Sequence, residues 1–361
     1  MKYLVILGDG MADRPIESLG GRTPLEYAKT PKMDELAAKG EIGMVHTIPD
    51  GMKPGSDTAN LSVLGYNPRE FYSGRSPLEA LSIGVPMKDT DVALRCNIVT
   101  LSEEEDNYED RTIIDHSSGE ISTEECAVLL EAVKKELETD IFHFYVGTSY
   151  RHCLIWENGE VVDLVQPHDV LGQKIGDKLP ENEALRTMMK KSYDILVNHP
   201  INIERKKKGL NPANSCWFWG AGTKPALYPF TERTHKKGAM ISAVDLLKGI
   251  AVGTSMKVIT VDGANGGLDT NYEGKANAAL DVLTKDGYDF VYVHLEGPDE
   301  MGHQGSVEKK VKAIERLDER IIRPIAEGGG RRGFPHGGAS GSSDTDFSAH
   351  THGGQCAVSA L

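Results

Sequence analysis

Hydrophobic residues along the chain fall into short continuous runs and longer stretches with helical spacing, a pattern typical of a parallel sheet covered by helices. The first run, residues 2–9, is apolar and closes on a glycine and Asp9, as expected for a buried strand whose carboxyl end carries a ligand group. Residues 23–40 repeat apolar positions at helical spacing and end at a glycine, which predicts a helix. The alternation of strand and helix resumes late in the chain, at residues 214–222, 239–256, 257–266, 272–299 and 307–327.

The middle of the chain has a different pattern. Residues 91–101, 141–159 and 160–165 read as antiparallel strands, and residues 122–137 and 185–209 read as helices. We therefore predict an α/β fold in which a parallel-sheet domain is interrupted by a smaller, inserted α+β domain. The expected parts are the first half of the parallel-sheet domain, the insert, the second half and an aberrant, disordered tail, at residues 1–90, 91–200, 201–327 and 328–361.

Composition narrows the classes of function. The chain has 361 residues, 39% of them hydrophobic and 26% charged, with a formal net charge of −14. This acidity disfavours binding to nucleic acid or to anionic membrane surfaces, so a protein of this charge that handles phosphate needs local cations. The five cysteines lack CxxC spacing, and neither a signal peptide nor a transmembrane stretch is evident, which predicts a cytoplasmic protein. The pattern leaves the oligomeric state open.

Three separated segments carry residues suited to phosphoryl transfer. Asp9 ends the first strand, Ser56 stands at the start of a helical run, and Asp299 and His303 follow a second apolar strand. Carboxylate and imidazole groups four residues apart are able to bind one divalent cation. A serine at a helix N-terminus has N–H donors and the helix dipole beside its hydroxyl, which favour an anionic phosphate. The alternatives are a plain N-cap for Ser56, a helix cap for Asp299, and solvated surface roles for Asp9 and His303.

Seven blocks, occurring in the order of the family, resemble the archaeal-type, cofactor-independent phosphoglycerate mutases of the alkaline phosphatase superfamily: ILGDGMADRP, PGSDTANLSVLGYNP, YSGRSPLEA, LRCNIVT, YRHCLIW, NPANSCWFWGAGTKP and HLEGPDEMGHQG. The likeness runs from residue 1 to about residue 327. It implies an alkaline-phosphatase-like domain interrupted by a smaller one. It also implies interconversion of 2- and 3-phosphoglycerate, a step of glycolysis and gluconeogenesis, without bisphosphoglycerate.

The resemblance also implies roles for individual residues. Ser56 is the expected nucleophile, which forms a phosphoserine. Two divalent metal ions are expected, Mn²⁺ first, with Mg²⁺ or Zn²⁺ as alternatives. Asp9 and Ser56 would hold one ion, and Asp299 and His303 the other. The expected substrate-binding residues lie in family-like blocks and are Arg75, Arg95, His116, Arg151, His152 and Lys224. Surface salt bridges for the cations and a loop role for His116 are the alternatives.

The tail departs from the family after residue 327. The family has a final strand that ends in an Asp-His pair, followed by a histidine in an Arg-Thr-His-Thr context, and together these residues complete both metal sites. No Asp-His dipeptide follows Asp299 here. If the codons allowed from about Gly329 onward are read one nucleotide later, one solution contains both blocks in family order. We therefore predict a frameshift near Gly328 and impaired activity, with His350 and His352 as the alternative ligands.

Two further functions compete with the mutase. A phosphatase or a homoserine kinase-like phosphotransferase would use the same nucleophile and metals. A non-catalytic, truncated product would bind one metal weakly or bind only a partner.

Overall fold

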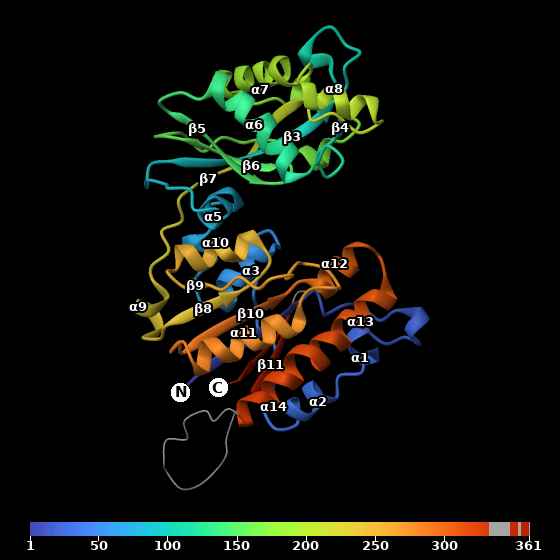
Figure 1. The fold of residues 1–361 in the computed structure, drawn as a ribbon. Helices are drawn as coiled ribbons and strands as arrows, with labels where there is room; N and C mark the ends of the chain where they lie inside the picture. The colour runs from blue at the N-terminus through green and yellow to red at the C-terminus, as the bar shows by residue number, and fades with distance from the viewer. Residues whose placement is uncertain (332–346, 353–354, 361) are drawn as a thin grey trace. The chain divides into compact units, whose positions relative to one another are not determined.

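The computed structural model describes residues 1–331, 347–352 and 355–360. It divides into two compact units, each described here by itself (Figure 1). Unit 1 comprises residues 1–71 and the chain from residue 227 onward, and unit 2 comprises residues 72–226. The insert thus begins before the predicted boundary at residue 91 and ends after the predicted boundary at residue 200.

Unit 1 is built on a seven-stranded sheet with the order β2-β11-β12-β1-β10-β8-β9. Its strands are β1 (Tyr3–Asp9), β2 (Glu41–Gly43), β8 (Gly238–Ile241), β9 (Lys257–Val258), β10 (Phe290–Leu295), β11 (Phe347–His352) and β12 (Gln355–Ala360). Strand β1 runs parallel to β10, with Leu7 opposite His294 and Gly8 opposite Leu295. Because the two strands end in step, the residues that follow them meet at the same edge of the sheet.

The helices of unit 1 come from both of its chain segments. They are α1 (Pro24–Tyr27), α2 (Pro31–Ala37), α3 (Ser56–Val63), α4 (Pro68–Phe71), α9 (Phe230–Thr234), α10 (Asp245–Gly253), α11 (Tyr272–Thr284), α12 (Gly297–His303), α13 (Val307–Leu317) and α14 (Arg323–Arg331), with a 3-10 turn η1 (Glu17–Leu19) and a π-helical turn η5 (Asp318–Ile322). The helix predicted over residues 23–40 is split into α1 and α2, because Pro31 disfavours helical geometry at the residue before it. The helix predicted over residues 307–327 passes through the π-helical turn instead of running regularly.

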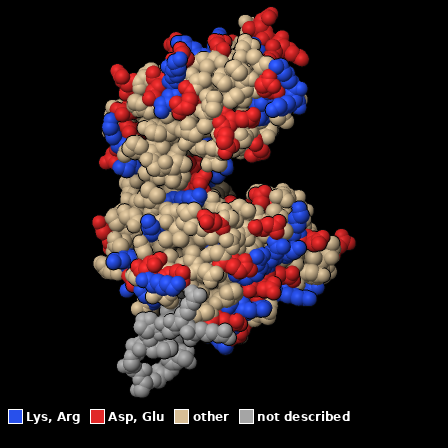
Figure 2. Space-filling view, viewed as in Figure 1, with Lys and Arg blue, Asp and Glu red and all other residues tan. Residues whose placement is uncertain are grey.

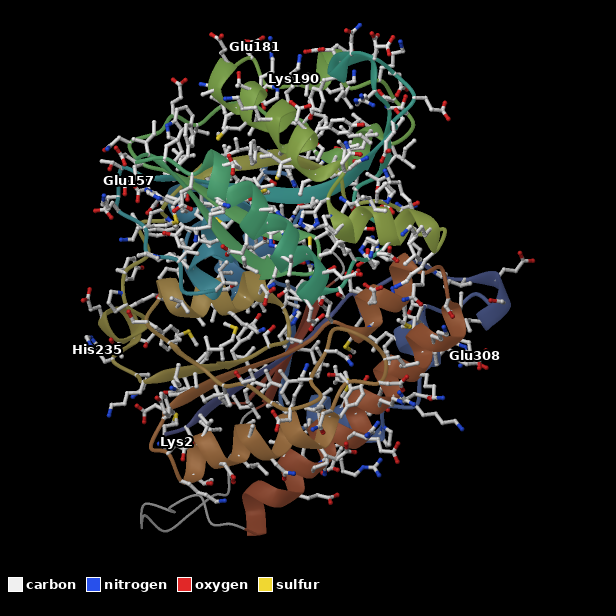
Figure 3. The ribbon with its side chains drawn as sticks, turned by 45° about the horizontal axis from the view of Figure 1, so that its top comes forward. Lys2, Glu157, Glu181, Lys190, His235 and Glu308 are labelled. Carbon is white, nitrogen blue, oxygen red and sulfur yellow. The ribbon has the colours of Figure 1, made fainter. Side chains whose placement is uncertain are left out.

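The core of unit 1 joins the strands to α11 and α13, which lie over the sheet in Figure 1. Leu4 and Ile6 of β1 pack in one buried cluster with Val291 and Val293 of β10. The helices contribute Ala276, Ala279, Ile314 and Leu317 to this cluster. At the opposite end of β1 from Asp9, Lys2 donates a 2.6 Å hydrogen bond to the Tyr288 carbonyl (Figure 3). The buried apolar cluster under β1 and β10 thus holds in place the strand that ends at Asp9.

Two strands lie in the segment predicted to be a disordered tail. β12 pairs antiparallel with β1 and with β11, which itself runs parallel to β2. For these two segments the prediction of disorder is wrong: the unpaired N–H and C=O groups at the edge of β1 accept an extended chain through backbone hydrogen bonds. Residues 332–346, 353–354 and 361 lie outside the described part, as do the side chains of β11 and β12.

Unit 2 is an antiparallel α+β unit. Its strands are β3 (Val92–Leu101), β4 (Ile113–Asp115), β5 (Phe142–Thr148), β6 (Arg151–Trp156) and β7 (Ser215–Thr223). Its helices are α5 (Arg75–Ser82), α6 (Thr123–Leu137), α7 (Glu183–Leu196) and α8 (Pro200–Lys207), with 3-10 turns η2 (Tyr108–Asp110), η3 (Pro167–Val170) and η4 (Gly176–Lys178). The order of strands is β4-β3-β6-β5. Strand β7 also pairs antiparallel with β3, along the edge of β3 opposite β6.

Three expectations for this region need correction. The segment 214–222 was expected to resume the parallel sheet, but β7 completes the antiparallel sheet of unit 2, because its apolar run supplies a second neighbour for the fully buried β3. Residues 160–165, expected to form a strand, have no regular structure. The helix expected over 185–209 is broken before α8, where Pro200 cannot continue the helical hydrogen bonding.

The two faces of the sheet in unit 2 have different neighbours. Leu94 and Cys96 of β3 and Leu154 of β6 belong to the cluster that includes helices α6 and α7. Ala93 and Cys153, one position away on the same strands, belong to the cluster that includes Ala80 of α5. Because side chains alternate along a strand, Arg95 and Arg151 share the α5 side of the sheet, and His152 takes the other side.

Candidate functional site

Ser56 and Asp9 meet at the carboxyl edge of the sheet in unit 1. The Ser56 hydroxyl donates a hydrogen bond of 3.4 Å to Oδ2 of the buried Asp9. Ser56 is the first residue of α3, whose N-cap is Gly55, so its hydroxyl is not the N-cap of this helix. The alternative role of Ser56 as the N-cap is thereby excluded. Its hydroxyl lies beside the N–H groups of the first helical turn, which have no partner within the helix.

Strand β10 fixes the start of α3. The side-chain amide of Asn60 donates 2.7 Å to the carbonyl of Ser56, and its oxygen accepts a 2.5 Å hydrogen bond from the buried Tyr292 hydroxyl. Tyr292 lies one strand away from Asp9, since β10 pairs with β1. The position of the Ser56 hydroxyl is therefore set by the sheet rather than by the preceding loop.

Asp299 lies close to Asp9 across a very tight backbone contact. Gly10 has φ of +68°, and a Cβ at this position would fall 2.4 Å from the Asp299 Cα, so only glycine fits. Burial raises the pKa of Asp299 above its ordinary value, and the nearby charge of Asp9 raises it further. His303, on the next turn of α12, places Nε2 3.3 Å from Asp299 Oδ2 and is largely exposed. Asp9, Ser56, Asp299 and His303 are thus gathered at one sheet edge.

Two side chains at this edge were not singled out from the sequence. His294 of β10 is buried, with Nε2 3.4 Å from Asp9 Oδ2 and Nδ1 3.4 Å from the Ser242 hydroxyl. Glu296 follows the strand, and burial raises its pKa, with smaller contributions from Asp9 and Asp299. The available signal was a histidine inside the apolar run FVYVHL, because a polar residue in a buried strand needs partners.

The side chains at this edge of the sheet are of the types that bind a hard divalent cation. Asp9 and Asp299 offer carboxylate oxygens, His303 an imidazole and Ser56 a hydroxyl, and the raised pKa of Asp299 marks two carboxylates whose repulsion a cation would relieve. Within the part of the chain that the structure describes, however, no group of three or more His, Cys, Asp or Glu side chains has a geometry that could hold a metal ion. These side chains are therefore of suitable types for a divalent cation, but the described residues bring too few of them together to complete a metal site.

Unit 2 gathers basic side chains on the α5 side of its sheet. Glu79 on α5 contacts two of them: its Oε1 accepts a 2.8 Å hydrogen bond from Nε of Arg75, and its Oε2 lies 2.9 Å from Nε of Arg95. The second contact is an ion pair without hydrogen-bond geometry, since the buried Arg95 Nε has no hydrogen-bond partner among the residues that the structure describes. Burial lowers the pKa of Arg95 to about 10, and the positive charges of Arg75 and Arg151 lower it as well. Arg95 therefore lies close enough to both Arg75 and Arg151 for their charges to act on it.

His116 lies beside this group. Its ring centroid is 5.8 Å from that of Tyr150, which itself carries Arg151 over its face. The Nδ1 atom of His116 is buried, and no described residue forms a hydrogen bond with it. We call Arg75, Arg95, His116 and Arg151 the cationic cluster of unit 2; all four belong to the expected substrate-binding set.

The other two residues of the expected set lie elsewhere in unit 2. His152 is buried on the helix side of the sheet, where Nδ1 accepts 3.0 Å from the Gly147 N–H and Nε2 lies 3.1 Å from Cys126 Sγ. Burial lowers the pKa of His152 to about 4, as expected for a neutral core histidine. Lys224 forms a 3.1 Å ion pair with Asp89. Because side chains alternate along β6, His152 and the neighbouring Arg151 lie on opposite faces of the sheet. A sequence motif that contains both residues does not show this separation.

Together these features define the class of protein: a two-unit α/β protein with a serine and carboxylates at the edge of a parallel sheet and a cationic cluster on an antiparallel insert. Residues 37–202 match the family model described as 2,3-bisphosphoglycerate-independent phosphoglycerate mutase. A protein of that name from Methanosarcina barkeri is 52% identical over 330 residues, covering 90% of this chain and 81% of its own length. The chain belongs to the 2,3-bisphosphoglycerate-independent phosphoglycerate mutase family.

Solved structures agree with this assignment. A protein from Pyrococcus horikoshii superposes with a TM-score of 0.77 at 30% identity, covering all of this chain and 88% of its own. A cofactor-independent phosphoglycerate mutase from Thermoplasma acidophilum superposes with a TM-score of 0.63 at 27% identity, with coverages of 100% and 90%. The expected α/β fold, with a parallel and an antiparallel sheet, is confirmed. In the described residues, no helix is both long and apolar enough to span a membrane.

Proposed function

We propose that this chain descends from, and is built as, a phosphoglycerate mutase that interconverts 2- and 3-phosphoglycerate through a phosphoserine at Ser56. The observation that carries the proposal is the hydroxyl of Ser56 at the start of α3, hydrogen-bonded to a buried carboxylate at the edge of a parallel sheet in a chain of this family. A hydroxyl held this way is oriented for attack on a phosphorus atom.

The reaction requires two transfers. The Ser56 hydroxyl gives up its proton and its oxygen forms a bond to phosphorus, while the bond from phosphorus to one glycerate oxygen breaks and that released oxygen takes up a proton to become a hydroxyl. The other glycerate hydroxyl then attacks the phosphoserine, and Ser56 is regenerated. Asp9 positions the serine through the hydrogen bond to its hydroxyl. When bound, two divalent ions, held by Asp9 with Ser56 and by Asp299 with His303, would offset the negative charge of the phosphoryl oxygens.

Glycerate must be retained between the two transfers, which distinguishes a mutase from a phosphatase. The cationic cluster of unit 2 supports this requirement, because guanidinium groups pair with carboxylates in a bidentate geometry. Arg151 is exposed at the start of β6, and the guanidinium of the buried Arg95 lies over the ring of Trp219, 4.3 Å from its centroid. We assign these groups to the recognition of the substrate's anionic oxygens.

A second candidate is a chain of this family that has lost catalysis. The observation that favours it is the incomplete donor set among the described residues, together with a tail that lacks the Asp-His pair of the family. Two protein ligands per ion leave the remaining positions to water and do not fix the geometry of in-line transfer.

One experiment tests the proposed function. The chain is incubated with 3-phosphoglycerate and excess Mn²⁺, 2-phosphoglycerate is measured by a coupled assay, and Ser56 is examined for phosphate by mass spectrometry after acid quenching. Turnover together with phosphate on Ser56 supports the mutase. Phosphate on Ser56 with release of glycerate indicates a phosphatase, and neither product indicates the non-catalytic chain.

A further inference from the structure

A second histidine of unit 2 lies against the cationic cluster and was not part of the expected set. The ring centroid of His168, on the 3-10 turn η3, is 6.0 Å from that of His116 and 5.5 Å from that of Trp219, in edge-to-face geometry with both. Trp219 is also the ring over which the guanidinium of Arg95 lies. His168 therefore shares its two ring neighbours with the cluster.

The segment that carries His168 is anchored at both ends. The indole of the buried Trp217 donates 2.8 Å to the carbonyl of Val165, just before the turn. Pro167 and Val170, which flank His168 on η3, are buried, while the His168 side chain remains 43% exposed. An imidazole that is accessible but held between two rings loses little conformational entropy when a ligand binds.

The charges around His168 favour an anionic ligand. Burial lowers the pKa of His168, and His116, Arg95 and Arg75 lower it further, whereas the nearby Asp169 opposes these effects. The three arginines of the cluster have Glu79 as the carboxylate shared by Arg75 and Arg95. Asp169 lies 3.7 Å from His168 Nε2 and is itself mostly exposed. The guanidinium groups of Arg95 and Arg75 thus act on His168, and they would also attract an anion bound beside it.

We propose that His168 is a further substrate-binding residue, whose imidazole N–H donates to an anionic oxygen of the phosphoglycerate bound by the cationic cluster. The inference rests on the proposed function for the identity of the substrate. The ligand class, a small carboxylate or phosphomonoester anion, follows from the clustered arginines and histidines themselves. Trp219, which contacts both Arg95 and His168, should report the binding.

The test measures binding, so that it does not depend on turnover. The intact chain is titrated with 3-phosphoglycerate, with glycerate and with inorganic phosphate, and the dissociation constants are measured by calorimetry and by tryptophan fluorescence. His168→Ala should weaken binding of 3-phosphoglycerate about 10-fold, the size expected for one lost hydrogen bond to a charged group. His168→Gln, which retains a donor, should recover part of the affinity. Whichever of glycerate and phosphate loses affinity identifies the oxygen contacted.

The matched control is His143→Gln, because His143 lies in the same unit and pairs with Glu157 at 3.5 Å instead of with the cluster. Circular dichroism confirms that each variant is folded, and Trp219→Phe should remove the fluorescence change, which assigns the signal to Trp219. Equal affinities for wild type and His168→Ala, or no binding of any of the three anions by wild type, would overturn the proposal. Binding that depends on His168 without interconversion would leave it standing and refute only mutase activity.

Discussion

The Nε2 atom of His294 lies 3.4 Å from Oδ2 of Asp9, and both side chains are almost completely buried at the carboxyl edge of the sheet in unit 1. The other imidazole nitrogen lies 3.4 Å from the Ser242 hydroxyl, which also accepts the N–H of Val244. Oδ2 of Asp9 is thus contacted by both His294 and Ser56. Such outer partners orient a carboxylate that is used as a ligand or as a positioning group.

Replacing His294 should impair the site more than the fold. In a frame-corrected chain, His294→Asn should lower turnover by about 10- to 100-fold and reduce the rise in melting temperature produced by Mn²⁺, because Asp9 loses an orienting partner. His235→Asn is the control, since His235 is exposed in a left-handed turn of the same unit (Figure 3). An unchanged Mn²⁺ response in His294→Asn would contradict the positioning role.

Removing the hydroxyl of Ser56 should separate activity from stability. Ser56→Ala in the frame-corrected chain should abolish turnover, whereas the lost hydrogen bond to Asp9 costs about 1 kcal/mol of unfolding free energy or less. Ser62→Ala on the same helix is the control and should leave turnover unchanged. Kinetic assays and urea unfolding supply the two measurements, and full activity of Ser56→Ala would exclude the phosphoserine route.

A buried lysine behind the site should give the protein a distinctive dependence on pH. Burial lowers the pKa of Lys275 from 10.5 to about 8, while its Nζ donates 3.1 Å to the His294 carbonyl. Between pH 8 and 10.5 the unfolded chain holds this proton and the folded chain does not, so the contribution of Lys275 to stability rises with pH across that window.

The variant Lys275→Met removes this titration. Below pH 8 it should be more stable than wild type by up to a few kcal/mol, less the cost of leaving the His294 carbonyl without its donor. The advantage should shrink as the pH rises from 8 toward 10.5. Urea unfolding of both proteins at several pH values measures the difference, and a difference that is constant with pH would show that Lys275 is not held at a lowered pKa.

The strands that end at the site could be predicted from the sequence, because apolar runs closed by a carboxylate determine both a buried strand and its functional end. Asp9, Ser56 and Asp299 are predicted as site residues in this way, and the structure brings the three to one edge of the sheet. The role of His294 could not be predicted, because its partners Asp9 and Ser242 come from distant parts of the chain. His152 was misplaced for a related reason: the alternation of a strand separates two residues that are adjacent in sequence.

Surface chemistry was predicted less well than the interior. The grouping of the cationic cluster depends on which face of the sheet packs against α5. The sequence motifs do not indicate that face. The position of His168 beside the cluster was not predicted, because the short segment around Pro167 has no hydrophobic periodicity from which its neighbours could be inferred. On the face drawn in Figure 2, acidic and basic side chains are interspersed in each unit, so the charge pattern of that face indicates no site.

The tail provides the sharpest prediction, because it concerns whether the chain is active at all. We expect the chain with its present tail to interconvert phosphoglycerates at least ~100-fold more slowly than a chain corrected by one nucleotide near Gly328, both with saturating Mn²⁺. The physical reason is coordination: in the proposed site Asp9 with Ser56 and Asp299 with His303 would give each ion two protein ligands, and the corrected tail would add an Asp-His pair and one further histidine. Alanine at that Asp-His pair should return the corrected chain to the low rate and remove its Mn²⁺-dependent rise in melting temperature. Sequencing the coding DNA around Gly328 is the independent measurement. Equal turnover of the two chains would reject the frameshift and direct attention to His350, His352 or other groups as ligands.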